Sequence, residues 1–143
     1  MKALLAKLTG PHPTLTDTAL LALRLWFGLV MLVAHGWGKW GNLDKFAAGL
    51  AEQGYPIPDV MAVLAAASES IGGLFVALGL LTRPAALTMV VTMLVAAFVA
   101  HPGEWKKQEL PLTYAAIAFG LMLAGAGRFS LDHLIAKRLR SNE

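Results

Sequence analysis

The chain has 143 residues, of which 57% are hydrophobic and only 15% are charged, and its mean hydropathy is +0.60. A soluble domain carries about 45–50% apolar and ~25% charged residues, so this composition favours an integral membrane protein. The absence of cysteine excludes disulfide exchange, thiolate nucleophiles and thiolate-held iron–sulfur clusters, and we attribute the net charge of +3 to membrane topology rather than to nucleic-acid binding.

Four apolar runs predict four transmembrane helices, at about 18–35, 60–81, 84–100 and 111–127. Each run is close to the ~20 residues that a helix needs to cross a bilayer, and all seven prolines lie outside the runs or at their edges. The helices of a soluble bundle would need polar faces, which these runs lack. We therefore expect an all-α fold: a four-transmembrane-helix bundle forming a single integral membrane domain over 1–143.

The first run contains Arg24, a charge within an apolar segment. Counting from Arg24, the 4-3-4-4 spacing of Gly28, Met31, His35 and Lys39 predicts that they share one face of a straight helix. Ionisable residues at membrane depth mark candidate functional sites, so this face is a candidate.

Two short segments, 42–54 and 130–140, are predicted to be amphipathic helices at the membrane interface, with Ser130 as the N-cap of the second. Their apolar faces would hold Leu43, Phe46, Ala47 and Leu50 in one and Leu131, Leu134, Ile135 and Leu139 in the other. We favour interfacial anchoring over docking of a partner for both.

The second run contains Glu69 near its middle, beside a packing face of small residues that includes Ser68 and Gly72. A charged residue at the bilayer centre costs about 2.5–3.5 kcal/mol on insertion scales, so Glu69 needs a partner or a proton. Two interpretations stay open: a charged Glu69 paired with Arg24 that ties two helices together, or a neutral acid in a ligand or proton site.

The last two runs add His101, at the end of the third, and Tyr114, at the start of the fourth. Together with His35 they would form a ring near the outer boundary, above Glu69. A metal site of His35, His101, Glu69 and Glu104 is an alternative, but the sequence has no HExxH or HxxEH spacing, and we expect no metal.

The distribution of Lys and Arg predicts that both termini are cytoplasmic. One side would hold seven basic residues, Lys2, Lys7, Arg83, Arg128, Lys137, Arg138 and Arg140, and the other four, Lys39, Lys45, Lys106 and Lys107. Three tryptophans, Trp37, Trp40 and Trp105, fall on the outer side, as an interfacial aromatic belt would.

The order of these motifs resembles the DoxX family of small bacterial four-helix membrane proteins. The resemblance rests on Arg24, "HGWGK" at 35–39, "ESIGGLFVALGLLTRPAA" at 69–86, His101, and "GAGRFSLD" at 125–132. It implies a multi-pass protein of the bacterial cytoplasmic (inner) membrane that is linked to redox or oxidative-stress chemistry. The recurring polar positions of the family fall on Arg24, His35, Lys39, Glu69, Arg83 and His101.

The resemblance and the polar interior together favour a quinone-binding or quinone-linked oxidoreductase subunit, with ubiquinone or menaquinone as the candidate cofactor. Glu69 is then the candidate proton acceptor, and the candidate ligand-binding residues are His35, Lys39, His101, Tyr114 and Arg24. Alternatives are a scaffold that recruits soluble redox enzymes and a small-solute or proton transporter. Expected partners are the lipid bilayer, a redox protein and further copies of the chain, with no nucleic acid. The sequence does not decide whether the chain is an enzyme by itself.

Overall fold

A computed structural model describes the chain at residues 2, 10 and 12–141; Lys7, which contributes to the predicted topology, lies outside them. The described residues form helices and no strands, which confirms the all-α prediction. Three helical stretches are long and apolar enough to cross a membrane: Pro13–Trp40, Pro58–Leu78 and Thr82–Ala100. They contain the first three predicted runs, apart from the last residues of the second.

The first of these stretches is one continuous rod of three segments. Helix α2 (Pro13–Val30) begins with a proline at its first position, where no backbone N–H is needed. It continues without a break into a π-helix, η1 (Met31–Gly36), and then into α3 (Trp37–Trp40). The rod extends beyond the predicted run 18–35 at both ends, because the helix continues through the residues of lower hydropathy at 13–17 and 36–40.

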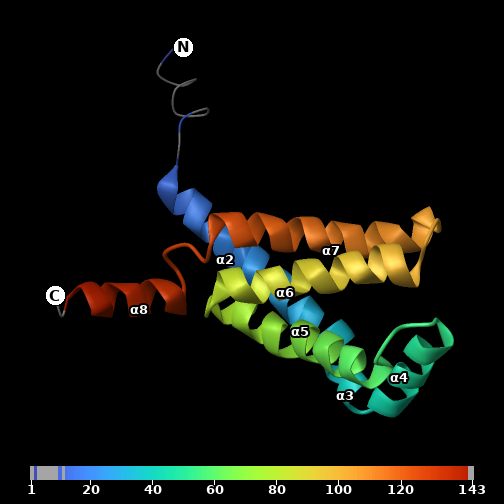
Figure 1. Cartoon of the computed structure of the whole chain (residues 1–143). Coiled ribbons are helices and arrows are strands. Elements are labelled where there is room, and N and C mark those ends of the chain that lie inside the picture. Colours follow the sequence, from blue (N-terminus) through green and yellow to red (C-terminus); the bar gives the residue numbers. More distant parts are fainter. Residues whose placement is uncertain (1, 3–9, 11, 142–143) are drawn as a thin grey trace.

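The second and third stretches form the antiparallel hairpin that the short connection predicts (Figure 1). Helix α5 (Pro58–Leu78) ends three residues before the predicted run does, because Gly79 adopts φ +67° and the Leu80 N–H donates to Phe75 O at 2.9 Å. Helix α6 (Thr82–Val95) follows at once and ends in a second π-helix, η2 (Ala96–Ala100).

Helix α7 (Trp105–Ala124) returns along α6 (Figure 1). It begins before the predicted run 111–127, so Pro111 lies inside the helix rather than at its edge. Its first turns carry Lys106, Lys107 and Glu109, and the helix is not among the three long apolar ones. A fourth crossing therefore stays a prediction.

The predicted amphipathic segment 42–54 forms helix α4 (Leu43–Glu52). Its apolar face is the expected one, but that face packs on the protein: Ala47 and Leu50 are buried in a cluster with Tyr55 and Ala62 of the following loop and α5. The partner of this face is α5 rather than the membrane interface.

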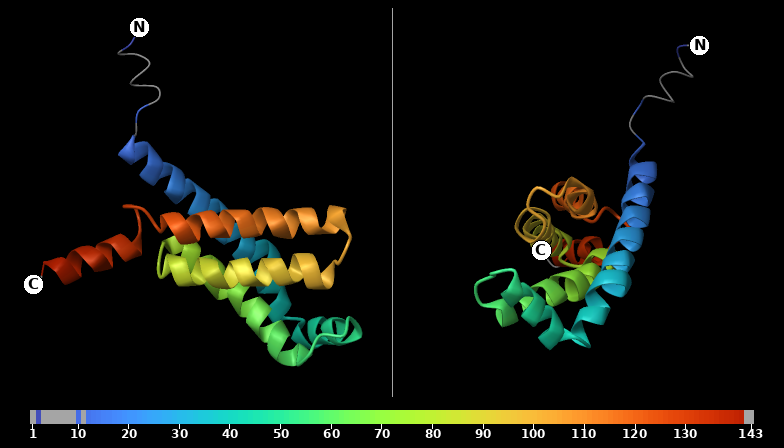
Figure 2. Two further views of the ribbon diagram at one scale, coloured as in Figure 1. Left: turned by 45° about the horizontal axis from the view of Figure 1, so that its top comes forward. Right: turned by 90° about the vertical axis from the view of Figure 1, so that its right-hand side faces the viewer.

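The second amphipathic segment forms helix α8 (Leu131–Arg140). Ser130 caps it as predicted, since its Oγ accepts a hydrogen bond from the His133 N–H at 3.1 Å. Helix α8 extends beyond the end of the bundle (Figures 1 and 2), and its apolar side chains are exposed, with Leu134 at 55% and Leu139 at 65%.

The core lies where α2 and η1 cross α5, beneath α6 and α7. Its largest members include Phe27, Met31 and Met89. At the crossing the two backbones touch: a Cβ on Gly28 would lie 2.5 Å from Gly73 O, and one on Gly36 would lie 2.5 Å from Ser70 N. Glycine is required at both positions because any side chain would push the helices apart.

We expect Gly36→Ala to destabilise the protein by about 1–3 kcal/mol, the usual cost of overpacking a close contact. Gly38→Ala is the matched control, since a Cβ there would meet nothing within 4 Å. Thermal unfolding of the two variants in lipid nanodiscs measures the difference. Equal melting temperatures would contradict the close crossing.

Candidate functional site

The π-helix changes which side chains of the first rod face α5. A π-turn holds more residues than an α-turn, so side chains beyond η1 are rotated relative to a straight α-helix. Gly28 and Gly36, eight residues apart, therefore both face α5, where a straight helix would present His35 instead. The predicted common face of Arg24, Gly28 and His35 is wrong for this reason.

The displaced His35 faces α7. Its ring lies edge-on to that of Tyr114, with centroids 5.4 Å apart, and Tyr114 also contacts Phe27 at 5.9 Å. The predicted pair of His35 and Tyr114 is thus brought together, as an aromatic cluster between η1 and α7.

Beyond η1, Lys39 lies beside Glu69 of α5. The Lys39 ammonium donates to Glu69 Oε2 and forms an ion pair with it. Glu69 is only 4% exposed, whereas the Lys39 side chain is 24% exposed and its Nζ lies 5.2 Å from the centre of the Phe46 ring. A carboxylate this deeply buried requires such a partner, because desolvation disfavours an unpaired charge.

The residues next to this pair tie the same two helices together. Trp40 Nε1 donates to Ser70 Oγ at 2.8 Å, and Ser70 Oγ donates to Ala66 O at 2.6 Å. Consecutive residues of α3, Lys39 and Trp40, thus bond to consecutive residues of α5, Glu69 and Ser70. This double contact holds the ion pair in place.

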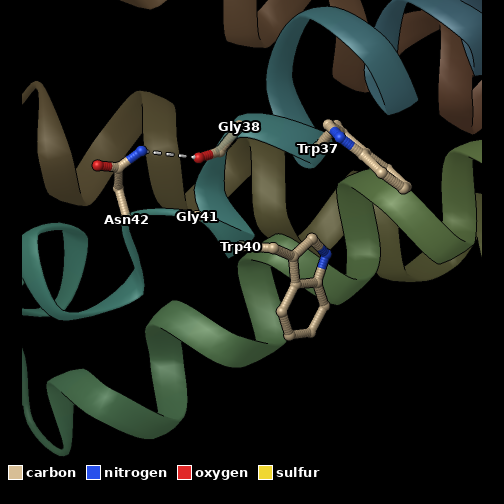
Figure 3. Close-up of a pocket in the computed structure, with 5 residues that line it drawn as sticks. All are labelled: Trp37, Gly38, Trp40, Gly41 and Asn42. Atoms are coloured by element: carbon tan, nitrogen blue, oxygen red, sulfur yellow. Dashed lines mark hydrogen bonds between the residues drawn. The ribbon is translucent and has the colours of Figure 1, made fainter.

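An open hollow of about 560 Å³ lies beside the ion pair, lined by Trp37, Gly38, Trp40, Gly41 and Asn42. Figure 3 shows the two indole rings projecting from the helix, and Asn42 Nδ2 donating to Gly38 O at 3.3 Å. Trp37 is 72% exposed, as expected for a residue of an interfacial belt. The hollow offers flat aromatic surfaces and amide groups within a few residues of Lys39.

Arg24 does not pair with Glu69. It is fully buried, its Nη2 donates to Phe129 O at 2.5 Å, and its Nη1 lies against Gly79 at the turn between α5 and α6. Because Lys39 occupies the carboxylate, the interpretation that Arg24 and Glu69 tie two helices together is wrong. Arg24 instead fastens the segment before α8 to the bundle.

The same segment, 127–132, makes further bonds to the bundle. Asp132 accepts from the N–H groups of Leu81, at 2.7 Å, and Thr82, at 3.0 Å, while its own N–H donates to Gly79 O at 2.8 Å. Leu81 has φ +45° and no capping side chain, so Asp132 caps α6 in its place. The motif "GAGRFSLD" is visible in the sequence, but the partners of its residues lie between 50 and 111 residues away and no local pattern indicates them.

His101 lies at the turn between η2 and α7, apart from Glu69. Its Nδ1 is 3.9 Å from Glu104 Oε1, and its carbonyl accepts from Gln108 at 2.8 Å. Lys107 bonds to Glu104 at 2.7 Å and lowers the pKa of that carboxyl group. No group of three or more His, Asp or Glu side chains within the described ranges could hold a metal ion.

This architecture, all-helical with several apolar helices of membrane length, is that of a multi-pass membrane protein. The chain belongs to the DoxX family, whose model matches residues 19–102, a segment that includes both Lys39 and Glu69. It is 31% identical over 136 residues to the "Uncharacterized membrane protein Rv3486" of Mycobacterium tuberculosis, covering 84% of this chain and 83% of that protein. No solved structure matches the chain.

We expect removal of either partner of the ion pair to cost about 2 kcal/mol, because a charge-assisted hydrogen bond is lost and the other charge stays buried. Replacing both, Lys39→Met with Glu69→Met, should recover most of the loss. Unfolding in nanodiscs across this double-mutant cycle measures the coupling. Lys45→Met, at an exposed position of α4, is the control and should leave stability unchanged. Additive single effects would contradict a direct pair.

Proposed function

We propose that this chain is the membrane subunit of a quinone-linked redox system, in which Glu69 accepts protons from a quinol bound near the outer hollow. The observation that carries the proposal is the buried Lys39–Glu69 pair beside an aromatic-lined hollow. A buried, paired carboxylate next to a ligand-sized space is typical of a functional site.

The residues present fit a quinone head group. Flat indole faces at Trp37 and Trp40 suit stacking on a planar ring, and Asn42 carries N–H groups that suit its carbonyl oxygens. The hollow is open, so a ligand can reach it from the membrane. A buried arginine already bonded to a backbone carbonyl suits a structural role better than ligand binding, and for Arg24 we therefore favour the structural one.

A quinol supplies two electrons and two protons when it is oxidised. Within this chain, the Glu69 carboxylate takes the two protons one after the other and releases the first to the outer aqueous phase before it takes the second, and Lys39 balances the charge of the deprotonated form before and after each transfer. We assign the two electrons to an acceptor in a redox-protein partner. Helix α8, exposed, apolar on one side and basic at Lys137 and Arg138, lies at the other end of the bundle from the outer hollow, and for it we propose anchoring at the membrane interface.

We further propose four membrane crossings with both termini in the cytoplasm. Helix α7 lies antiparallel to α6. Its charged residues are confined to its first turns, and the remaining part, 110–124, is mostly apolar. The three tryptophans of the predicted belt are exposed at 41–72% and flank the ends of the apolar segments.

Replacement of Glu69 tests the function. We expect Glu69→Gln to lower quinone-linked turnover by about 100-fold, the usual contribution of a general base. Turnover is followed as oxidation of added ubiquinol or menaquinol by membrane vesicles that contain the chain and its partner. Glu52→Gln, an exposed carboxylate on α4, is the control. Undiminished turnover in the Glu69→Gln variant would contradict the proposal.

Cysteine labelling tests the topology, since the chain has no native cysteine. We expect Pro102→Cys to react with a membrane-impermeant maleimide in intact cells, and Ser141→Cys to react only after the cells are permeabilised. Labelling of both from the same side would show that α7 does not cross the membrane.

A further inference from the structure

A second hollow, of about 640 Å³, lies on the opposite side of α5 from the ion pair, along its seam with α6. It is lined by α5 between residues 64 and 75 and by the turn and α6 between residues 81 and 92, and most of its lining is apolar. A space of this size with few polar groups is typical of a small-molecule site. We call it the α5–α6 groove.

Three hydroxyl groups line this apolar groove: Ser68, Thr88 and Thr92. Thr88 Oγ1 donates to Ala85 O at 2.8 Å and Thr92 Oγ1 donates to Thr88 O at 2.9 Å, so both keep lone pairs that can accept. Ser68 is 8% exposed, and its Oγ has no hydrogen-bond partner among the described residues. An orphan hydroxyl in an apolar setting is costly, and a ligand oxygen would satisfy it.

The depth of these hydroxyls restricts the ligand. Residues 68–78 of α5 and 82–92 of α6 separate Ser68 and Thr92 from the connecting turn, about 15 Å of helix at ~1.5 Å per residue. That is half the ~30 Å thickness of the hydrocarbon core, so both lie near the bilayer midplane. A phospholipid keeps its charged head and ester groups at the boundary and cannot bring a polar oxygen to this depth.

We propose that the α5–α6 groove is a second binding site, for an uncharged lipophilic quinone or quinol with a prenyl tail. The Ser68 Oγ is buried in this structure, so its side chain rotates about χ1 to let a ring carbonyl accept from it; a quinol hydroxyl donates to Thr92, and the tail lies along the apolar lining. Only the choice of ligand class rests on the proposed function; the site is separate from Lys39 and Glu69, which face the other side of α5.

The floor of the groove is formed by Gly72. A Cβ there would lie 3.6 Å from Met89 Cε and 3.7 Å from Thr88 Oγ1, so a methyl group fits and fills part of the groove.

A photoreactive short-chain ubiquinone analogue tests the site in nanodiscs, with cross-links mapped by mass spectrometry. We expect labelling within 64–92 that excess decylubiquinone suppresses and that added phospholipid does not. Ser68→Ala should weaken binding about tenfold, the equivalent of one hydrogen bond. Gly72→Ala should reduce labelling by narrowing the groove. Thr113→Val, a lipid-side hydroxyl on α7 outside the groove, and Gly120→Ala, where a Cβ meets nothing within 4 Å, are the matched controls.

Loss of fold does not confuse the test, because removal of an unbonded hydroxyl should leave the melting temperature of Ser68→Ala unchanged. Labelling confined to 37–42 would overturn the groove and leave the proposed function standing. Groove labelling together with full turnover of the Glu69→Gln variant would overturn the proposed function and leave the groove site standing. Suppression of the labelling by phospholipid, or no labelling at all, would overturn the quinone site. So would a disulfide between two copies of a Leu64→Cys variant in a protein that is not labelled, because a second copy of the chain would then cover the groove.

Discussion

The contact on which the rest of the structure depends is the close crossing of the first rod with α5. Gly28 and Gly36 both bring backbone against backbone there, and lipid offers no alternative driving force that could hold two helices so tightly. Two glycines eight residues apart can face the same neighbour only if the helix between them takes an extra residue. The π-helix at 31–36 supplies that residue. From this one adjustment follow the bond of Trp40 to Ser70 and the turning of His35 towards α7.

The sequence predicted those features that depend on composition along the chain. Apolar runs indicate three of the long helices, Ser130 indicates the start of α8, and the spacing of leucines indicates its apolar face, because each of these signals is local. The partners of the buried charges could not be predicted in the same way. A register that assumes a straight α-helix places His35 towards α5, and the π-turn makes that assignment wrong. Arg24 precedes the π-turn and misses Glu69 because it lies at the level of Gly79, ten residues further along α5. The hydrogen-bond partner of Arg24 is the Phe129 carbonyl, 105 residues away, and no sequence periodicity indicates a contact over that separation.

The two ends of the bundle are held by different chemistry. At the α5–α6 turn the bonds are made largely with backbone groups: Asp132 to two N–H groups, and Arg24 to a carbonyl. Such bonds fix the backbone conformation of the turn and leave few side-chain groups that could bond to a ligand instead. At the other end the bonds join side chains, Lys39 to Glu69 and Trp40 to Ser70, next to an open hollow. Side-chain pairs can change protonation or give up a bond to a ligand, and so this end suits chemistry while the other suits anchoring of α8.

Helix α5 is the most buried of the three apolar helices, and its most polar stretch is Ser68, Glu69 and Ser70. Consecutive residues of a helix point about 100° apart, so a run of three polar residues cannot serve a single partner. Ser70 bonds to Trp40 and Glu69 bonds to Lys39, whereas Ser68, turned furthest towards α6, has no hydrogen-bond partner in the part of the chain that the structure describes. Two of the three are therefore explained by the crossing of the first rod. The third lies on a face that the crossing does not reach, and it is there that the helix retains a polar group for something outside the chain.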